Sequence, residues 1–131
     1  MEVDGENMEN MFAVFWIEKR ILHIRYKPEV FVDLGAARII VSDRIQFQNG
    51  KSFPVLCYAD GISNSTKPAR DYLAVKGCIL VKAIAYVAGP TVSRAILQFF
   101  IEKNKPAVPS AIFTTEMAAR EFLLPFVGRH L

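Results

Sequence analysis

The chain has 131 residues, of which 52% are hydrophobic and 22% are charged, and such a length and composition are typical of one folded domain. A chain of this length can bury a sufficient core without disulfides or a metal. Its longest uncharged stretch, residues 83–93, is too short to cross a bilayer, so we expect no membrane span. All 16 Lys and Arg follow residue 10, which leaves +7 on the body and −4 on the first ten residues. These basic residues are scattered singly, so we expect no nucleic-acid partner.

The start of the chain is acidic and contains no basic residue up to position 10. We therefore expect residues 1–10 to form a disordered tail rather than a secretory signal, and residues 11–131 to form a single domain. Residues 12–17 are apolar on both faces of an alternating pattern, which predicts a strand that is covered on both sides or pairs with another chain. Residues 21–26 alternate with one polar face that includes His23, so the two segments predict a hairpin ending at Pro28.

The rest of the chain alternates between predicted helices and strands. Short apolar runs at residues 53–59, 82–87 and 110–113 predict buried strands. Between and after them lie four helical segments, the first reaching about Gln48 and the third reaching Lys103. Each of these helices is preceded by an N-cap residue, whose side chain can accept a hydrogen bond from a backbone N–H of the first turn. The four N-cap residues are Asp33, Thr66, Thr91 and Thr115.

The predicted order is therefore β-β-α-β-α-β-α-β-α. Alternating strands and helices favour a parallel sheet with right-handed crossovers. The fold class that we expect is α/β, with a mixed, mainly parallel five-stranded sheet, an N-terminal β-hairpin and four helices.

No arrangement of residues typical of catalysis or cofactor binding is found. Neither a phosphate-binding glycine loop nor a nucleophile elbow occurs, and His23 and His130 are predicted at a hairpin surface and in the tail. No Cys or His pair has metal-ligand spacing, so we expect no metal and no cofactor. Cys57 and Cys78 stand in apolar surroundings and are interpreted as buried thiols of a reducing compartment. The sequence thus predicts a cytoplasmic protein that is not an enzyme.

Polar side chains follow two central strands, at the edge where α/β sheets commonly place their sites. They could bind an anion or a partner, although caps and turns are the commoner use of such residues. Hydroxyls close to a helix start also allow a phosphorylation site. The candidate residues of this edge are Asp60, Ser63, Ser65, Thr66, Thr91, Ser93 and Arg94.

The third helix carries more apolar residues than one core requires. Its expected core arc consists of Val92, Ala95, Ile96, Phe99 and Phe100. Beyond this arc lie further apolar side chains that predict a dimer or partner surface together with the doubly apolar first strand. The residues predicted for this surface are Phe15, Ile17, Leu97 and Ile101.

Several stretches resemble a known group of proteins: residues 67–73, residues 81–87 with Ser93-Arg94, and residues 99–106 running to 113–115. Over about residues 12–126, the chain resembles the small bacterial STAS-like proteins related to anti-sigma-factor antagonists and to the CRAL-TRIO lipid-binding fold. The resemblance implies a self-associating domain without enzymatic activity. Phosphorylated antagonists carry an Asp-Ser pair at the start of a helix, whereas here Gly61 follows Asp60, which departs from the pattern of a phospho-switch.

Two functions from different classes are therefore expected. The first is a non-enzymatic regulatory or protein-interaction module that forms a homodimer and binds a further, unidentified protein. The alternative is a binder of a small apolar or lipid-like ligand, which the kinship with CRAL-TRIO proteins implies.

Overall fold

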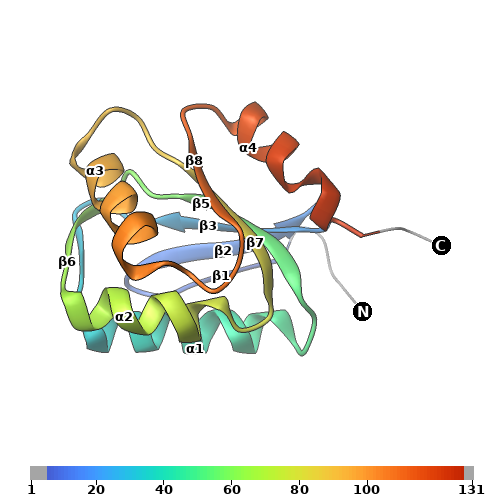
Figure 1. Ribbon diagram of the computed structural model, residues 1–131. Coiled ribbons are helices and arrows are strands. Elements are labelled where there is room, and N and C mark those ends of the chain that lie inside the picture. Colours follow the sequence, from blue (N-terminus) through green and yellow to red (C-terminus); the bar gives the residue numbers. More distant parts are fainter. Residues whose placement is uncertain (1–5, 129–131) are drawn as a thin grey trace.

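The computed structural model describes residues 6–128, which form a sheet with helices on both of its faces (Figure 1). The strands are β1 (Asn7–Glu9), β2 (Ala13–Glu18), β3 (Ile21–Tyr26), β4 (Val30–Val32), β5 (Phe53–Tyr58), β6 (Ile62–Ser65), β7 (Val81–Val87) and β8 (Ser110–Phe113). The helices are α1 (Leu34–Gln48), α2 (Lys67–Val75), α3 (Val92–Phe99) and α4 (Glu116–Leu123). Short helical turns follow α2, α3 and α4.

The main sheet is mixed, as the sequence predicts, but it has six strands in the order β1-β2-β3-β5-β7-β8 rather than five. The first three strands are antiparallel, and β5, β7 and β8 each add in parallel to the strand before. The predicted hairpin is β2 and β3, with Ala13 opposite Tyr26 and Glu18 opposite Ile21.

The sixth strand corrects the expectation of a disordered tail over residues 1–10. Residues 1–5 lie outside the described part of the chain, but Asn7–Glu9 pair with β2. The acidic composition of this segment suggested disorder, but two specific contacts hold it against the sheet. Lys27 Nζ lies 2.6 Å from Glu9 Oε2, and the side-chain oxygen of Asn10 accepts hydrogen bonds from the backbone N–H groups of Phe12 and Ala13.

A second departure is the small parallel pair formed by β4 and β6. Residues 62–65 belong to the polar segment that follows the strand predicted at residues 53–59. They form a strand because the neighbouring backbone offers hydrogen-bond partners. Val30 N–H donates to the Gly61 carbonyl at 2.8 Å, and Thr66 N–H donates to the Val32 carbonyl at 3.0 Å. Thr66 is the N-cap of α2, so its bond to Val32 also connects this pair to the start of that helix.

Strand order decides where the helices lie. Because each parallel strand adds on the same side of its predecessor, right-handed crossovers place the connecting helices α1, α2 and α3 on one face of the sheet. Side chains of these helices, including Ala37, Ala69 and Leu97, share one core cluster with Phe15 and Val55. On the opposite face, Ala119 and Leu123 of α4 pack against Leu56, Ala83 and Ala85 (Figure 1). No helix within residues 6–128 is both long and apolar enough to cross a membrane.

Helix α3 is rotated relative to the predicted core arc. Val92, Ala95 and Phe99 were expected in the core, but they are exposed, Val92 by 67% and Phe99 by 49%. The side chains that face the sheet are Ser93, Leu97 and Phe100 instead. The rotation follows from Ser93, whose hydroxyl donates to the carbonyls of Asp60 and Ile62 at 3.1 and 2.7 Å and thereby turns this side of the helix inward.

Candidate functional site

The residues predicted at the carboxyl edge of the sheet are partly brought together. The Asp60 carboxylate accepts a hydrogen bond from Gly89 N–H at 3.1 Å, while Ser93 donates to the Asp60 carbonyl. Arg94 donates to the Ala88 carbonyl at 3.3 Å. These contacts join the end of β5 to the loop that leads into α3, so their role in the structure is to hold two turns together.

The remaining candidates of this edge also have intramolecular partners. Ser63 donates to the Val30 carbonyl at 3.0 Å, and the hydroxyl of Ser65 accepts from Arg70 at 3.1 Å. Thr66 caps α2 as predicted, since its hydroxyl accepts from Ala69 N–H at 3.3 Å. Thr91 precedes α3 but makes no such cap bond, and its hydroxyl donates to the Gly89 carbonyl at 3.5 Å.

The two threonines give a matched test of the capping interpretation. Thr66→Ala should lower the free energy of unfolding by about 1 kcal/mol, because it leaves a first-turn N–H of α2 without its acceptor. Thr91→Ala removes only a long, exposed hydrogen bond and should change stability by less than about 0.5 kcal/mol. Urea unfolding at pH 7 measures both values, and equal losses in the two variants would contradict the assignment.

Strand order gives no independent reason to expect a ligand crevice at this edge. Doubly wound α/β proteins bind ligands where the strand order reverses and neighbouring crossovers leave on opposite faces of the sheet. Here the order from β3 through β5 and β7 to β8 never reverses. The site expected at the carboxyl edge therefore stays a prediction.

The predicted dimer or partner surface is also corrected. Phe15, Ile17 and Leu97 are exposed by 0%, 7% and 4%, and all three belong to the core of this chain. Ile101 is half-buried and packs against the same core. Strand β2, which was the first strand predicted, is apolar on both of its faces. The face that bears Trp16 is covered in part by the rings of His23 and Tyr58 from the same sheet.

A cavity of about 80 Å³ lies between the sheet and helices α1, α2 and α3. Most of the side chains around it are apolar and come from five strands and three helices. Lining residues that remain half-buried, among them Ser65, Arg70 and Ile96, mark its open side between β6, α2 and α3. The full lining is Ile24, Tyr26, Val32, Ile40, Val41, Arg44, Val55, Cys57, Ile62, Ser65, Arg70, Leu73, Gly77, Ile84, Tyr86, Ile96, Leu97 and Phe100.

Arg44 is the most unusual of these residues, and sequence reasoning missed it. It is only 2% exposed, and its guanidinium donates to the side-chain carbonyl of Gln48 and, at 3.2 Å, to the Gly77 carbonyl. Both partners are neutral, and no carboxylate of residues 6–128 forms an ion pair with Arg44. The available signal was its place on α1, one turn after the buried Ile40 and Val41.

A second arginine, Arg70, lies at the open side. One of its terminal nitrogens donates to the carbonyl of Ser65 at 2.8 Å, and its guanidinium carbon is 5.1 Å from the centre of the Phe99 ring. Its Nε is buried and has no hydrogen-bond partner. Arg70, which was not predicted as part of a site, thus lines the cavity at its open side and contacts the Phe99 ring.

The other ionisable groups around the cavity carry no charge at neutral pH. Burial raises the pKa values of Tyr26, Tyr86 and Cys57 well above neutrality, so all three stay protonated. Burial also lowers the pKa of Arg44 to about 10, which still leaves the guanidinium charged. The cavity therefore combines apolar walls with a buried positive charge that no carboxylate among the described residues balances.

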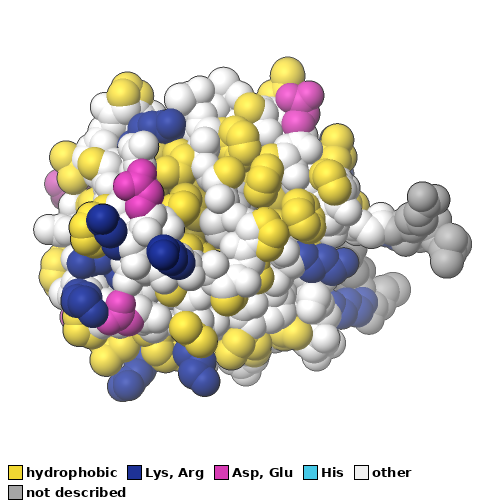
Figure 2. All heavy atoms as spheres, viewed as in Figure 1, with side chains coloured by type: hydrophobic (Ala, Val, Ile, Leu, Met, Phe, Trp, Pro, Cys, Tyr) yellow, Lys and Arg dark blue, Asp and Glu magenta, His cyan; other side chains and the backbone are white. Residues whose placement is uncertain are grey.

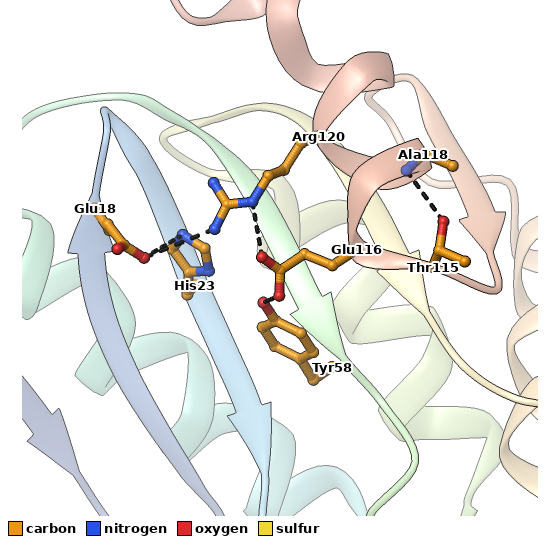
Figure 3. Close-up of polar contacts among 7 residues, drawn as sticks. All are labelled: Glu18, His23, Tyr58, Thr115, Glu116, Ala118 and Arg120. Carbon is orange, nitrogen blue, oxygen red and sulfur yellow. Dashed lines mark hydrogen bonds and ion pairs between the residues drawn. The ribbon is translucent and has the colours of Figure 1, made fainter.

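The opposite face of the sheet holds a cluster of titratable side chains (Figure 3). Tyr58 donates to Glu116 at 2.5 Å, and Arg120 Nε donates to the other oxygen of that carboxylate at 2.9 Å. Glu18 lies 3.7 Å from Arg120 and 3.9 Å from His23 Nε2. The cluster connects α4 to strands β2, β3 and β5.

The surroundings shift the pKa values of three groups in this cluster. Hydrogen bonds from Tyr58 and Arg120 lower the pKa of Glu116, and burial, with the bond to Glu116, raises the pKa of Tyr58 to about 12. Burial and Arg120 lower the pKa of His23 to about 4. His23 was predicted at the surface, but it is 0% exposed because Trp16 and Tyr58 stack along it on the neighbouring strands. We interpret this cluster as a structural connection.

The surface adds little to the choice of site. Figure 2 shows hydrophobic side chains gathered over β8 and α4, and basic and acidic side chains interspersed over α2 and α3. The exposed residues of α4 and the following turn include Met117 and Leu124. Within residues 6–128, no group of three or more His, Cys, Asp or Glu could hold a metal ion. Both cysteines are buried free thiols, as predicted.

Comparison with known proteins gives a family but no activity. Residues 15–127 match a family model described as "Domain of unknown function (DUF7793)". This match extends over most of the chain and includes the sheet from β3 onward, all four helices and the whole lining of the cavity. No curated protein and no solved structure matches the chain significantly.

Proposed function

We propose that this chain, which belongs to the DUF7793 family of domains of unknown function, binds a small, largely apolar ligand in the cavity between the sheet and helices α1, α2 and α3. The observation that carries the proposal is the cavity itself. Protein interiors are normally close-packed, so a cavity of about 80 Å³ lined mainly by apolar side chains departs from ordinary core packing. An apolar ligand of matching size would contact these side chains.

The volume of the cavity and the side chains that line it restrict the class of ligand that it can bind. The cavity is roughly half the volume of an engineered cavity of about 150 Å³ that binds benzene, so a short chain or a small ring fits, with the rest of a longer molecule passing the open side. The neutral phenols and thiol around it favour binding over catalysis, because none is in a form that attacks or removes a proton from a ligand.

We also propose a STAS-like architecture for the fold. Its support is the antiparallel hairpin followed by alternating parallel strands and helices. Binding of an apolar ligand is the property that the resemblance to CRAL-TRIO proteins implies. The regulatory, self-associating module also stays a prediction. Three of the four residues predicted for its surface are buried, so this module rests on the resemblance alone.

Titration with straight-chain alcohols of four to eight carbons tests the binding function. We expect saturable binding by calorimetry, together with shifts of the methyl NMR signals of Val55, Ile84 and Leu97, which line the cavity. Val55→Phe should fill the cavity, raise the free energy of unfolding by about 0.5–2 kcal/mol and abolish binding.

The matched control is Val87→Phe, which places the same side chain near α4 on the opposite face of the sheet and should leave binding unchanged. If no alcohol of the series binds the wild-type protein saturably, or if Val55→Phe binds as well as the wild type, the cavity is not the ligand site.

A further inference from the structure

The buried guanidinium of Arg44 sets a requirement on what enters the cavity. A charge removed from water is strongly unfavourable unless an opposite charge and hydrogen bonds compensate it. Arg44 is 2% exposed and has two neutral hydrogen-bond partners, and none of the eighteen lining residues is Asp or Glu. The lining of the cavity thus solvates this cation in part and gives it no counter-charge.

The position of the guanidinium is fixed by a chain of hydrogen bonds. Gln48, which accepts from Arg44, is itself only 2% exposed and donates to the carbonyls of Lys51 and Leu80 at 2.9 and 2.8 Å. Arg44 also donates to Gly77, in the turn that follows α2. Two terminal N–H groups are used in this way, while a guanidinium carries more donors than two. The guanidinium is therefore held in a fixed position while some of its N–H groups remain without an acceptor, and such an arrangement can bind an anion.

The remaining polar groups suit one negative charge rather than two. Tyr26 and Tyr86 line the same cavity and, as neutral phenols, can donate hydrogen bonds. Arg70 is half-buried at the open side, where solvent and a cation–π contact with the Phe99 ring stabilise its charge. A single buried guanidinium is therefore the only cation in the closed part of the lining, and a monoanion neutralises it.

We infer that the ligand is an amphipathic monocarboxylate whose acid group binds Arg44 and whose apolar body lies among Val55, Ile84 and Leu97. This inference rests on the proposed ligand-binding function. It names the class of compound, a short aliphatic or aromatic carboxylic acid, that the cavity takes in preference to neutral molecules of the same shape.

Three six-carbon compounds with the same tail test the inference on the wild-type protein at pH 7: hexanoate, hexanol and hexylammonium. A charge-assisted, bidentate contact should make hexanoate bind about 10- to 100-fold more tightly than hexanol by calorimetry. Hexylammonium should bind at least about 10-fold more weakly than hexanol, because it adds a second positive charge to the cavity.

Variants of the two arginines assign the contact. Arg44→Met should reduce hexanoate affinity to that of hexanol and leave hexanol within about 3-fold of its wild-type value. Arg44→Lys keeps the charge without the planar fork and should lose about 3- to 10-fold for hexanoate. Arg70→Gln, at the open side, tests the competing position for the acid group. The matched control is Arg38→Gln, on the exposed side of α1 and outside the lining, and it should change hexanoate affinity by less than about 3-fold.

Each result decides between the two proposals. Equal binding of hexanoate and hexanol by the wild type would overturn the carboxylate assignment and leave an apolar binding site standing. If none of the three compounds binds, the binding function itself is wrong. A loss in Arg70→Gln as large as in Arg44→Met would move the anion to the opening. If Arg44→Met does not fold, the wild-type comparison and Arg44→Lys still give the answer.

Discussion

Replacing Gly61 with alanine is expected to lower the free energy of unfolding by about 4 kcal/mol. A Cβ atom at this position would stand 2.2 Å from the Lys27 carbonyl oxygen and 2.6 Å from that of Tyr26. Both atoms belong to the backbone at the end of β3, so no side-chain rotation relieves the overlap. The turn between β5 and β6 must therefore move away from β3, which breaks the contact between Gly61 and Val30 that starts the β4–β6 pair.

Gly35→Ala is the matched control for this substitution. Its Cβ would meet only a side-chain oxygen of Asp33 at an ordinary distance of 3.5 Å, and Gly35 lies within the first turn of α1. Alanine there should raise the free energy of unfolding by about 0.5–1 kcal/mol, because the unfolded chain loses conformational freedom. Urea unfolding followed by circular dichroism measures both changes. A Gly61→Ala protein within 1 kcal/mol of the wild type would show that the turn adapts.

Acidification from pH 7 to pH 4.5 is expected to lower the free energy of unfolding by about 2–3 kcal/mol through His23 alone. Burial lowers the pKa of this imidazole from 6.5 to about 4, and both ring nitrogens are buried without a hydrogen-bond partner. Protonation in the folded state would place a cation beside Trp16 and Tyr58 and near Arg120. Glu18 and Glu116, which also face the ring, offset only part of this penalty.

The direction of the effect follows from proton binding. Between pH 6.5 and 4 the unfolded chain holds a proton on this histidine and the folded chain does not, so stability is complete above pH 6.5 and decreases as the pH falls. Glu116 acts in a separate window, because its pKa is lowered from 4.5 and its contribution is lost only at lower pH. The range between pH 6.5 and 4.5 therefore reports on His23.

Phenylalanine at position 23 separates the imidazole charge from its packing. His23→Phe keeps a flat ring against Trp16, whose centre lies 4.9 Å from that of the imidazole, and should make the free energy of unfolding nearly constant between pH 7 and 4.5. His130→Gln replaces the other histidine of the chain and should retain the wild-type slope. A wild-type protein whose stability does not change over this range would contradict the burial of a neutral His23.

Much of the fold could be predicted because local patterns and global packing agree. Asp33, Thr66 and Thr115 cap their helices as expected, and the four long strands and the order of the helices follow from alternation and chain punctuation. The failures have a common cause. The burial of Phe15 and the rotation of α3 depend on contacts with residues far away in the sequence. One example is the Ile62 carbonyl that binds Ser93, and the local pattern of apolar residues carries no information about such contacts.

The candidate site was harder to predict for the same reason. Polar residues at strand ends were expected to form it, and of these residues Ser65 alone lines the cavity. The buried charge of the cavity comes from Arg44. An arginine at this position of an apolar helix face could equally lay its stem on the surface of the protein and keep its charge in water. Only the packing of α2 and the turn at Gly77 against α1 determines that this charge is enclosed.

The lengths of the strands also bear on how this protein behaves at high concentration. Strands at the two borders of a sheet present unpaired backbone groups to which other molecules can add. In this sheet the borders are β1 and β8, with three and four residues, whereas the four strands between them have six or seven. Pro109 directly precedes β8 and lacks an N–H donor. The molecule thus offers little template for fibril growth, and association through sheet extension is disfavoured.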